Sequence, residues 1–92
     1  MYLENSKDAY VSIIIPTYNS SKSLPLCLEA IRRQKYPYKE VLVVDNYSED
    51  ETRRIAENLG ANVILHRGTP AVARNVGIIR SKGDYVLFLD SD

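Results

Sequence analysis

Carboxylates follow two apolar runs of this sequence, at the point where each run ends. Asp45 closes the run VLVVD, and Asp90 and Asp92 follow YVLFL with one serine between them. Two carboxylates at that spacing can approach Mg²⁺ or Mn²⁺, which prefer oxygen ligands and keep positions open for phosphate oxygens. The Asp-Ser-Asp triplet therefore favours a metal site that could hold a diphosphate. For Asp45 alone, a structural role in a turn is equally well supported.

Four further residues, which lie between the two apolar runs in the sequence, could have a chemical or a structural role. Arg74, early in the third expected helix, could pair with phosphate or form a surface salt bridge, and Asn75 follows it. His66 is the only histidine and stands at a strand end, where we favour a structural role. Gly77 lies inside a helix, which costs about 1 kcal/mol relative to alanine. Close approach of another part of the chain or of a ligand would explain that glycine.

Short apolar runs alternate with segments of helical periodicity along the whole chain. The expected strands are residues 11–15, 41–44, 63–65 and 85–89. Runs of this length, rich in β-branched residues, are typical of strands buried on both faces. The alternation predicts parallel strands joined by right-handed helical crossovers. We therefore expect an α/β fold, a three-layer α/β/α sandwich around a mainly parallel four-stranded sheet in the order 3-2-1-4.

The first two expected helices carry recognisable end signals. Pro25 falls in the first turn of the first helix, which should run to about Lys35 because Pro37 blocks its continuation. Ser48 and Glu51 have the spacing of a capping box at the start of the second helix.

The third expected helix begins at Thr69 and Pro70, which read as an N-cap followed by the first helical residue. Val72, Val76 and Ile79 then recur about one turn apart. This spacing predicts that their common face packs on the sheet.

The sheet order predicts where a ligand would bind. Ligands of such sheets bind outside the carboxyl ends of the strands, near the topological switch, which here lies between the first and fourth strands. Pro16 and Tyr18 follow the first strand, Asp45 ends the second, and Asp90 follows the fourth. These residues should therefore gather on one rim.

Composition narrows the classes of partner. Lys plus Arg is 12 and Asp plus Glu is 12 over 92 residues, so a nucleic-acid surface based on bulk charge is excluded. A local basic cluster formed by Arg32, Arg33 and Lys35 reads as a solvated helix face, with contact to acidic lipid or protein as the alternative.

Cysteine usage and the apolar runs bear on location. Cys27 is the only cysteine, which excludes an internal disulfide and favours a reducing compartment. Residues 1–10 form a polar lead-in rather than a signal peptide, and no apolar run is long enough to span a membrane. We expect a single domain over residues 1–92 in the cytoplasm, or at the cytoplasmic face of a membrane as part of a longer enzyme.

Several blocks in order resemble one known family. The segments VSIIIPTYNSSKSLPLCLEAI, EVLVVDNYSEDET and GTPAVARNVGIIRSKGDYVLFLDSD are similar to successive blocks of the inverting family 2 glycosyltransferases, which have the GT-A fold, a Rossmann-like arrangement. The resemblance covers residues 11–92. It implies a transferase of the hexosyltransferase type, with a nucleoside diphosphate sugar as donor, by family habit a UDP-sugar, and a divalent metal, Mn²⁺ or Mg²⁺.

The resemblance also implies roles for individual residues. Pro16 and Tyr18 would line the base pocket, and Asp45 would hydrogen-bond the nucleobase. Arg74 would lie near the base or the phosphates, with Asn75 as a supporting contact at best.

The Asp-x-Asp motif of the family corresponds to the last three residues. Asp90 would contact the ribose or a metal-bound water, and Asp92 would be the direct metal ligand, so the predicted metal residues are Asp92 and Asp90.

This chain departs from the family in one loop. The family usually reads Asp-Asp-Gly-Ser where this chain has Asp45-Asn46-Tyr47-Ser48. Tyr47 replaces a glycine, so another backbone path is expected there. Asn46 removes a carboxylate at a position that catalysis does not need.

In the family, the acceptor site and the general base follow the Asp-x-Asp. No residue of this chain can be assigned as the base that deprotonates an acceptor hydroxyl, so the catalytic residue stays unknown. We expect an inactive fragment of a longer enzyme whose acceptor is an unknown glycan, lipid or protein. The free edge of the fourth strand makes a homodimer a further hypothesis.

Other classes of α/β protein fit the sequence less well. A dinucleotide-dependent enzyme lacks support because no Gly-x-Gly-x-x-Gly follows the first strand. A receiver-like signalling domain would need a carboxylate directly after the first strand and a lysine at a later strand end. This chain has Pro16 at the first position and no suitable lysine. A non-catalytic α/β nucleotide-binding module, or an interaction module without a ligand, stays open as the alternative.

Overall fold

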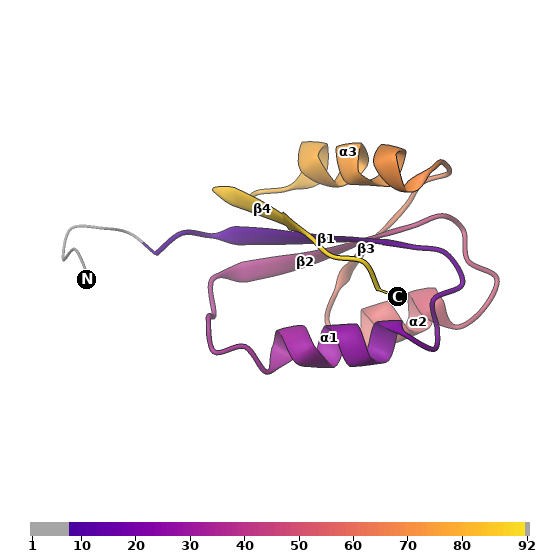
Figure 1. Cartoon of the computed structure of the whole chain (residues 1–92), viewed down its shortest axis with the longest axis horizontal. Helices are drawn as coiled ribbons and strands as arrows, with labels where there is room; N and C mark the ends of the chain where they lie inside the picture. The colour runs from indigo at the N-terminus through magenta and orange to yellow at the C-terminus, as the bar shows by residue number, and fades with distance from the viewer. Residues whose placement is uncertain (1–7, 92) are drawn as a thin grey trace.

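The computed structural model of the chain describes residues 8–91, so most of the expected lead-in and Asp92 lie outside the described residues. Strands and helices alternate along the chain, as Figure 1 shows. The elements are β1 (Val11–Thr17), α1 (Leu24–Arg32), β2 (Lys39–Asp45), α2 (Thr52–Asn58), β3 (Asn62–Leu65), α3 (Pro70–Arg80) and β4 (Tyr85–Phe88).

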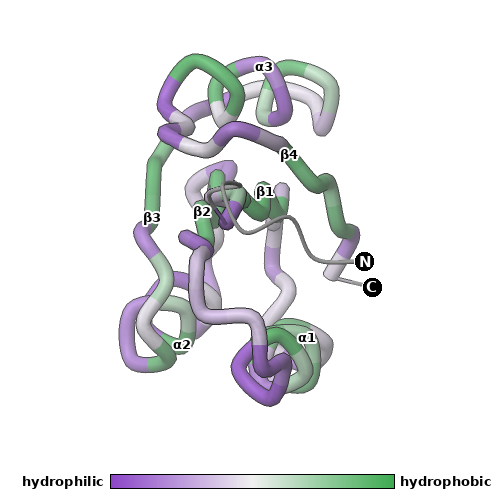
Figure 2. The backbone as a smooth tube through the Cα atoms, turned by 90° about the vertical axis from the view of Figure 1, so that its left-hand side faces the viewer, coloured by the Kyte–Doolittle hydropathy of each residue, from purple (hydrophilic) through white to green (hydrophobic). Residues whose placement is uncertain are grey.

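The four strands form one parallel sheet in the order β3-β2-β1-β4. Helices α1 and α2 cover one face of this sheet and α3 covers the other (Figures 1 and 2). The predicted three-layer sandwich and its strand order are therefore confirmed. The order also places the carboxyl ends of β1, β2 and β4 at one edge.

The pleat of β1 divides the core between the two faces of the sheet. Ile13 and Ile15 pack with α1 and α2, whereas Ile14 faces Ala73 of α3. Successive side chains of a strand point to opposite faces, so a run of β-branched residues fits a strand covered on both sides. Each such fully buried aliphatic side chain stabilises the fold by about 1.5–3 kcal/mol.

Helix α3 packs on the sheet through a different face from the predicted one. Ala73 and Gly77 are buried against the sheet, with Val76 half-buried, whereas Val72 is exposed and Ile79 is 80% exposed. A Cβ on Gly77 would lie 2.5 Å from Cγ2 of Ile14. Small residues therefore bring this helix close to the strands, and the prediction that Val72 and Ile79 pack inward is wrong.

Two of the predicted helix ends also differ from the structure. α1 ends at Arg32, a turn before Lys35. The capping box at Ser48 does not form, because the Ser48 side chain hydrogen-bonds Asp45 instead and α2 begins only at Thr52.

The start of α3 is as predicted. Thr69 Oγ1 accepts a hydrogen bond from the N–H of Val72 at 3.3 Å, and Pro70 occupies the first turn. Among residues 8–91, no helix combines the length and the hydropathy needed to cross a bilayer.

Candidate functional site

A cavity of about 180 Å³ opens at the carboxyl edge of the sheet, beside the N-terminus of α3. It is lined by residues that lie at or after the ends of β1, β2, β3 and β4. These residues are Pro16, Thr17, Tyr18, Ser20, Val44, Asn46, Gly68, Thr69, Pro70, Ala73, Asp90 and Ser91. Loops from separate parts of the sequence therefore build one site, at the place where the sheet order predicts a ligand.

Three of the predicted site residues meet in this cavity. Pro16, Tyr18 and Asp90 all line it. Arg74 lies beside them, because its Nη2 is 3.6 Å from Oδ1 of Asp90. The Asp90 side chain is 75% exposed, so this ion pair contributes little to stability and its carboxylate stays accessible.

Asp45, by contrast, is turned into the protein and has 0% of its surface exposed. Its Oδ1 accepts hydrogen bonds from Thr17 Oγ1 at 2.7 Å and Ser48 Oγ at 2.6 Å. Its Oδ2 accepts from the N–H of Ser48 at 2.8 Å. Three donors compensate for the loss of water around the buried charge. Because Asp45 has no exposed surface, direct contact with a nucleobase would require the surrounding loops to open, so the geometry does not favour its predicted role.

Asn46, the next residue, lines the cavity. Its backbone N–H donates to the carbonyl of Thr17 at 3.0 Å, and its side-chain Oδ1 accepts from the N–H of Gly68 at 3.4 Å. Asn46 is not among the predicted site residues, because catalysis does not need a carboxylate at its position. The available signal was its place directly after the last residue of a strand that ends at the site.

The loop after β1 is tied to the loop after β2. Asn19 has a left-handed backbone with φ of 48°, which asparagine tolerates better than most residues. Its N–H donates to Ser48 Oγ at 2.8 Å, and its Oδ1 accepts from the N–H of Glu49 at 2.8 Å. The N–H of Ser20 donates to Thr52 Oγ1 at 2.7 Å. These contacts hold the walls of the cavity in place before any ligand binds.

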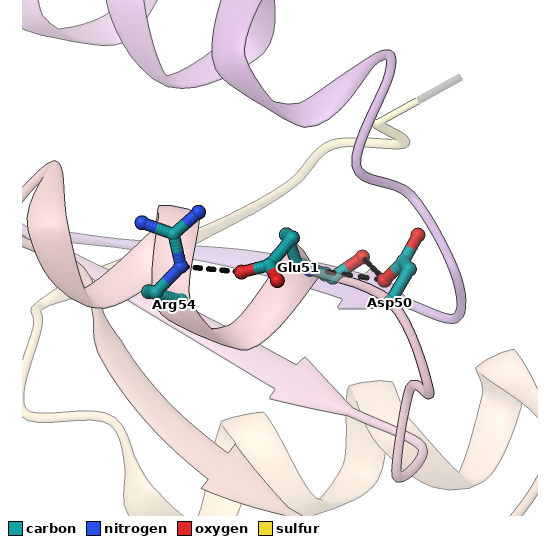
Figure 3. A network of polar contacts seen from close by, with 4 residues as sticks. Asp50, Glu51 and Arg54 are labelled. Atoms are coloured by element: carbon teal, nitrogen blue, oxygen red, sulfur yellow. Dashed lines mark hydrogen bonds and ion pairs between the residues drawn. The ribbon is translucent and has the colours of Figure 1, made fainter.

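Asp50 anchors the start of α2, as Figure 3 shows. It accepts hydrogen bonds from the hydroxyl of Thr52, from the N–H of Thr52 at 2.9 Å and from the N–H of Ser21 at 3.2 Å. The Thr52 hydroxyl is the main reason that the pKa of Asp50 is lowered to about 2. The neighbouring Glu51 forms an exposed ion pair with Arg54 in the same view.

An aromatic ring joins the loop after β2 to the loop after β3. Tyr47 has a left-handed backbone with φ of 52°, which costs a residue other than glycine about 1–2 kcal/mol. The guanidinium carbon of Arg67 lies 4.4 Å from the centroid of the Tyr47 ring. A cation–π contact of this kind contributes about 0.5–1 kcal/mol at an exposed site and so offsets part of the strain.

The acidic residues near the cavity determine whether a metal ion could bind there. Within residues 8–91 no three or more His, Cys, Asp or Glu side chains come close enough together to hold a metal ion, and Asp92 lies outside those residues. Mg²⁺ sites beside phosphates often use one or two carboxylates and take the other ligands from water and phosphate oxygens. The accessible carboxylate of Asp90 fits one place in such a site.

His66, for which a structural role is predicted, and Asn75, a predicted supporting contact, lie outside the cavity. His66 is exposed after β3, and its backbone N–H donates to the carbonyl of Asp45 at 3.0 Å. Asn75 is exposed on α3. Neither residue lies among those that line the cavity.

The family model for glycosyl transferase family 2 matches residues 12–92, nearly the whole chain. The chain belongs to glycosyl transferase family 2. The predicted family and the GT-A fold are thereby confirmed.

Named relatives of this family 2 chain are glycosyltransferases. Glycosyltransferase AglE of Haloferax volcanii is 41% identical, with the match covering 90% of this chain and 30% of AglE. The chain therefore spans less than a third of the length of that relative.

Two solved family 2 structures share the fold over most of this chain. Staphylococcus aureus TarS in complex with UDP-GlcNAc has a TM-score of 0.81 at 37% identity, over 90% of this chain and 26% of that one. The Pyrobaculum calidifontis mannosyltransferase PcManGT in complex with GDP-Man and Mn²⁺ has a TM-score of 0.81 at 32% identity, over 95% of this chain and 28% of that one.

Proposed function

We propose that this chain is the donor-binding part of an inverting glycosyltransferase that takes a nucleoside diphosphate sugar. The cavity at the carboxyl edge of β1, β2 and β4 is the observation that carries the proposal. Its position at the topological switch suits a nucleotide. Two relatives at more than 30% identity support the proposal, because their structures contain nucleotide sugars: TarS with UDP-GlcNAc, and PcManGT with GDP-Man and Mn²⁺.

The base would occupy the part of the cavity lined by Pro16, Tyr18 and Asn46. The Tyr18 ring offers an aromatic surface, and the Asn46 amide can both donate and accept hydrogen bonds to a base edge. We assign the polar base contact to Asn46 rather than to Asp45, because Asp45 is buried and already bound by three donors. A UDP-sugar stays the expected donor.

The diphosphate would lie between the N-terminus of α3 and the acidic end of the chain. Thr69 and Pro70 of the helix start line the cavity, and helix N-termini attract negative charge. Arg74 would add a guanidinium near the phosphates once its weak pair with Asp90 is exchanged.

A divalent cation, Mn²⁺ or Mg²⁺, would be held by Asp92 as direct ligand and by Asp90 directly or through water. When bound, it would supply positive charge that neutralises the leaving diphosphate. Asp90 and Arg74 would then orient the phosphate end of the donor.

Glycosyl transfer needs more than this donor site. The general base and the acceptor site are proposed to come from residues outside this chain, which spans 30% of AglE. The chain alone would therefore bind donor without transferring the sugar to a glycan, lipid or protein acceptor. A cytoplasmic location, free or at the face of a membrane, is part of the same proposal.

Calorimetry with UDP and with GDP, each with and without Mn²⁺, tests the proposal. We expect one nucleotide to bind in the presence of Mn²⁺, and EDTA or Asp92→Ala to abolish or strongly weaken that binding. Glu57→Gln, exposed on α2, is the matched control. Absence of heat with both UDP and GDP would overturn the proposal in favour of an interaction module without a ligand. Binding that is indifferent to the metal would overturn the metal assignment alone.

A further inference from the structure

The loop after β2 and the loop after β3 meet at two adjacent contacts. Asn46 Oδ1 accepts from the N–H of Gly68, and the guanidinium group of Arg67 stacks on the ring of Tyr47. Successive residues of one loop thus pair with successive residues of the other. Asn46 and Gly68 line the cavity, whereas Tyr47 and Arg67 are not among its lining residues.

Asn46 lies between two anchored positions, because Ser48, two residues later, is held by Asp45 and by Asn19. The N–H of Asn46 itself is held by the carbonyl of Thr17 at 3.0 Å, and the preceding Asp45 is held by three donors. The hydrogen bond from Gly68 is long, at 3.4 Å, and would not by itself hold the amide. Between Asn46 and the anchored Ser48, the direction of the chain depends on the left-handed backbone of Tyr47.

We propose that the Tyr47–Arg67 contact is a latch that positions Asn46 and so sets the affinity of the cavity for a nucleobase. Tyr47 and Arg67 are positioning residues: neither needs to touch the ligand. The latch rests on the proposed function, because the affinity it controls is that for a nucleoside diphosphate.

Gly68 explains how the other half of the latch stays in place. Its φ is 146°, and a Cβ there would lie 2.8 Å from Cγ1 of Val72. Glycine therefore allows the loop to fold tightly against the first turn of α3, which carries Arg67 to the ring of Tyr47. The two halves of the latch are thus built on elements that also form the cavity.

The first test is a double-mutant cycle on UDP affinity, measured on the whole protein by calorimetry with Mn²⁺. Arg67→Met keeps the aliphatic stem and removes the charge, and Tyr47→Leu removes the ring and keeps the strained backbone. A cation–π contact at a partly exposed site corresponds to roughly two- to five-fold in an equilibrium constant. We expect each variant to weaken binding about that much, and the double variant to be no weaker than either.

Two further variants separate positioning from simple stability. Arg67→Lys should restore part of the affinity because it restores the cation. In a Tyr47→Gly background the left-handed backbone is unstrained, so Arg67→Met should have no further effect on affinity. Arg53→Met, an exposed arginine of α2, is the matched control and should change nothing.

Hydrogen exchange of the unliganded protein gives a readout that needs no nucleotide. Arg67→Met should speed exchange at the N–H of Gly68 while leaving the N–H of Ser20, held by Thr52, unchanged. Additive effects on UDP affinity, or unchanged exchange at Gly68, would overturn the latch. A wild-type protein that binds no nucleoside diphosphate would overturn the proposed function, and the role of the pair in binding with it. Wild-type binding that all variants share equally would overturn the latch alone.

Discussion

At the scale of single residues, Asp45 and Asn46 are neighbours with opposite environments. The carboxylate of Asp45 is buried and satisfied by hydroxyl and N–H donors, whereas the amide of Asn46 lines the cavity. A buried acceptor that loses a good partner costs about 1–3 kcal/mol. The first residue therefore holds the site together, and the second is available to a ligand.

This division predicts different effects for the two substitutions. In Asp45→Asn, one acceptor oxygen becomes an NH₂ group that faces a donor, so the free energy of unfolding should fall by about 1–3 kcal/mol. Asn46→Ala should leave that free energy within about 0.5 kcal/mol and weaken nucleotide binding instead. Chemical denaturation and calorimetry on both variants check the contrast. Equal loss of stability in the two variants would contradict it.

Asp50 gives a prediction about acid. Its folded-state pKa is lowered to about 2, mainly by the Thr52 hydroxyl, whereas an unfolded aspartate titrates near ~3.9. A lowered folded-state pKa contributes stability above pH ~4, and that contribution is lost as the pH falls towards 2. The difference in urea midpoint between wild type and Asp50→Asn should be constant above pH ~4 and shrink below it. A difference that does not change over this pH range would contradict the assignment.

The sequence identified the rim but not the direction of each side chain on it. Pro16, Tyr18 and Asp90 could be placed because each follows a strand whose carboxyl end must lie at the switch point. The choice between Asp45 and Asn46 depends on backbone angles of an irregular loop. Tyr47 has a left-handed backbone in that loop, and the available signal was the glycine that the family usually has at this position.

At the scale of elements, the distance between α3 and the sheet is set by the smallest residues of the helix. Gly77 faces Ile14, which is fully buried, and Ala73 lies one turn earlier on the same side. The alternation of strands and helices could be predicted from apolar runs and breakers. The packed face of α3 could not, because hydrophobic periodicity gives weight to Val72 and Ile79 and none to a glycine that permits close approach.

Gly77→Ala tests this packing. Alanine favours a helix by about 1 kcal/mol over glycine, but its Cβ would lie 2.5 Å from Cγ2 of Ile14. Overpacking of this kind costs about 1–3 kcal/mol, so we expect a net loss of stability. Ile79→Ala, at an 80% exposed position, should change the free energy of unfolding by less than about 0.5 kcal/mol. Thermal unfolding of both variants decides, and a stabilised Gly77→Ala would show that the helix can move away from the sheet.

At the scale of the whole molecule, β4 is a short edge strand with exposed apolar side chains. The residues of β4 that face solvent include Tyr85, Leu87 and Phe88. Within the described residues β4 pairs only with β1, so its outer edge has unpaired backbone groups. An exposed apolar edge strand is a template for pairing with another chain.

We therefore expect the chain to self-associate through the edge of β4. Light scattering after size exclusion should give a mass that rises with concentration. Leu87→Lys, at a position that is 47% exposed, should shift the protein towards monomer, because a lysine on an edge strand opposes pairing. Leu26→Lys, on an exposed position of α1, is the matched control and should leave the mass unchanged. A monomer at high concentration in the wild type would contradict edge pairing, and an equal response of both variants would assign the association to general hydrophobic exposure rather than to β4.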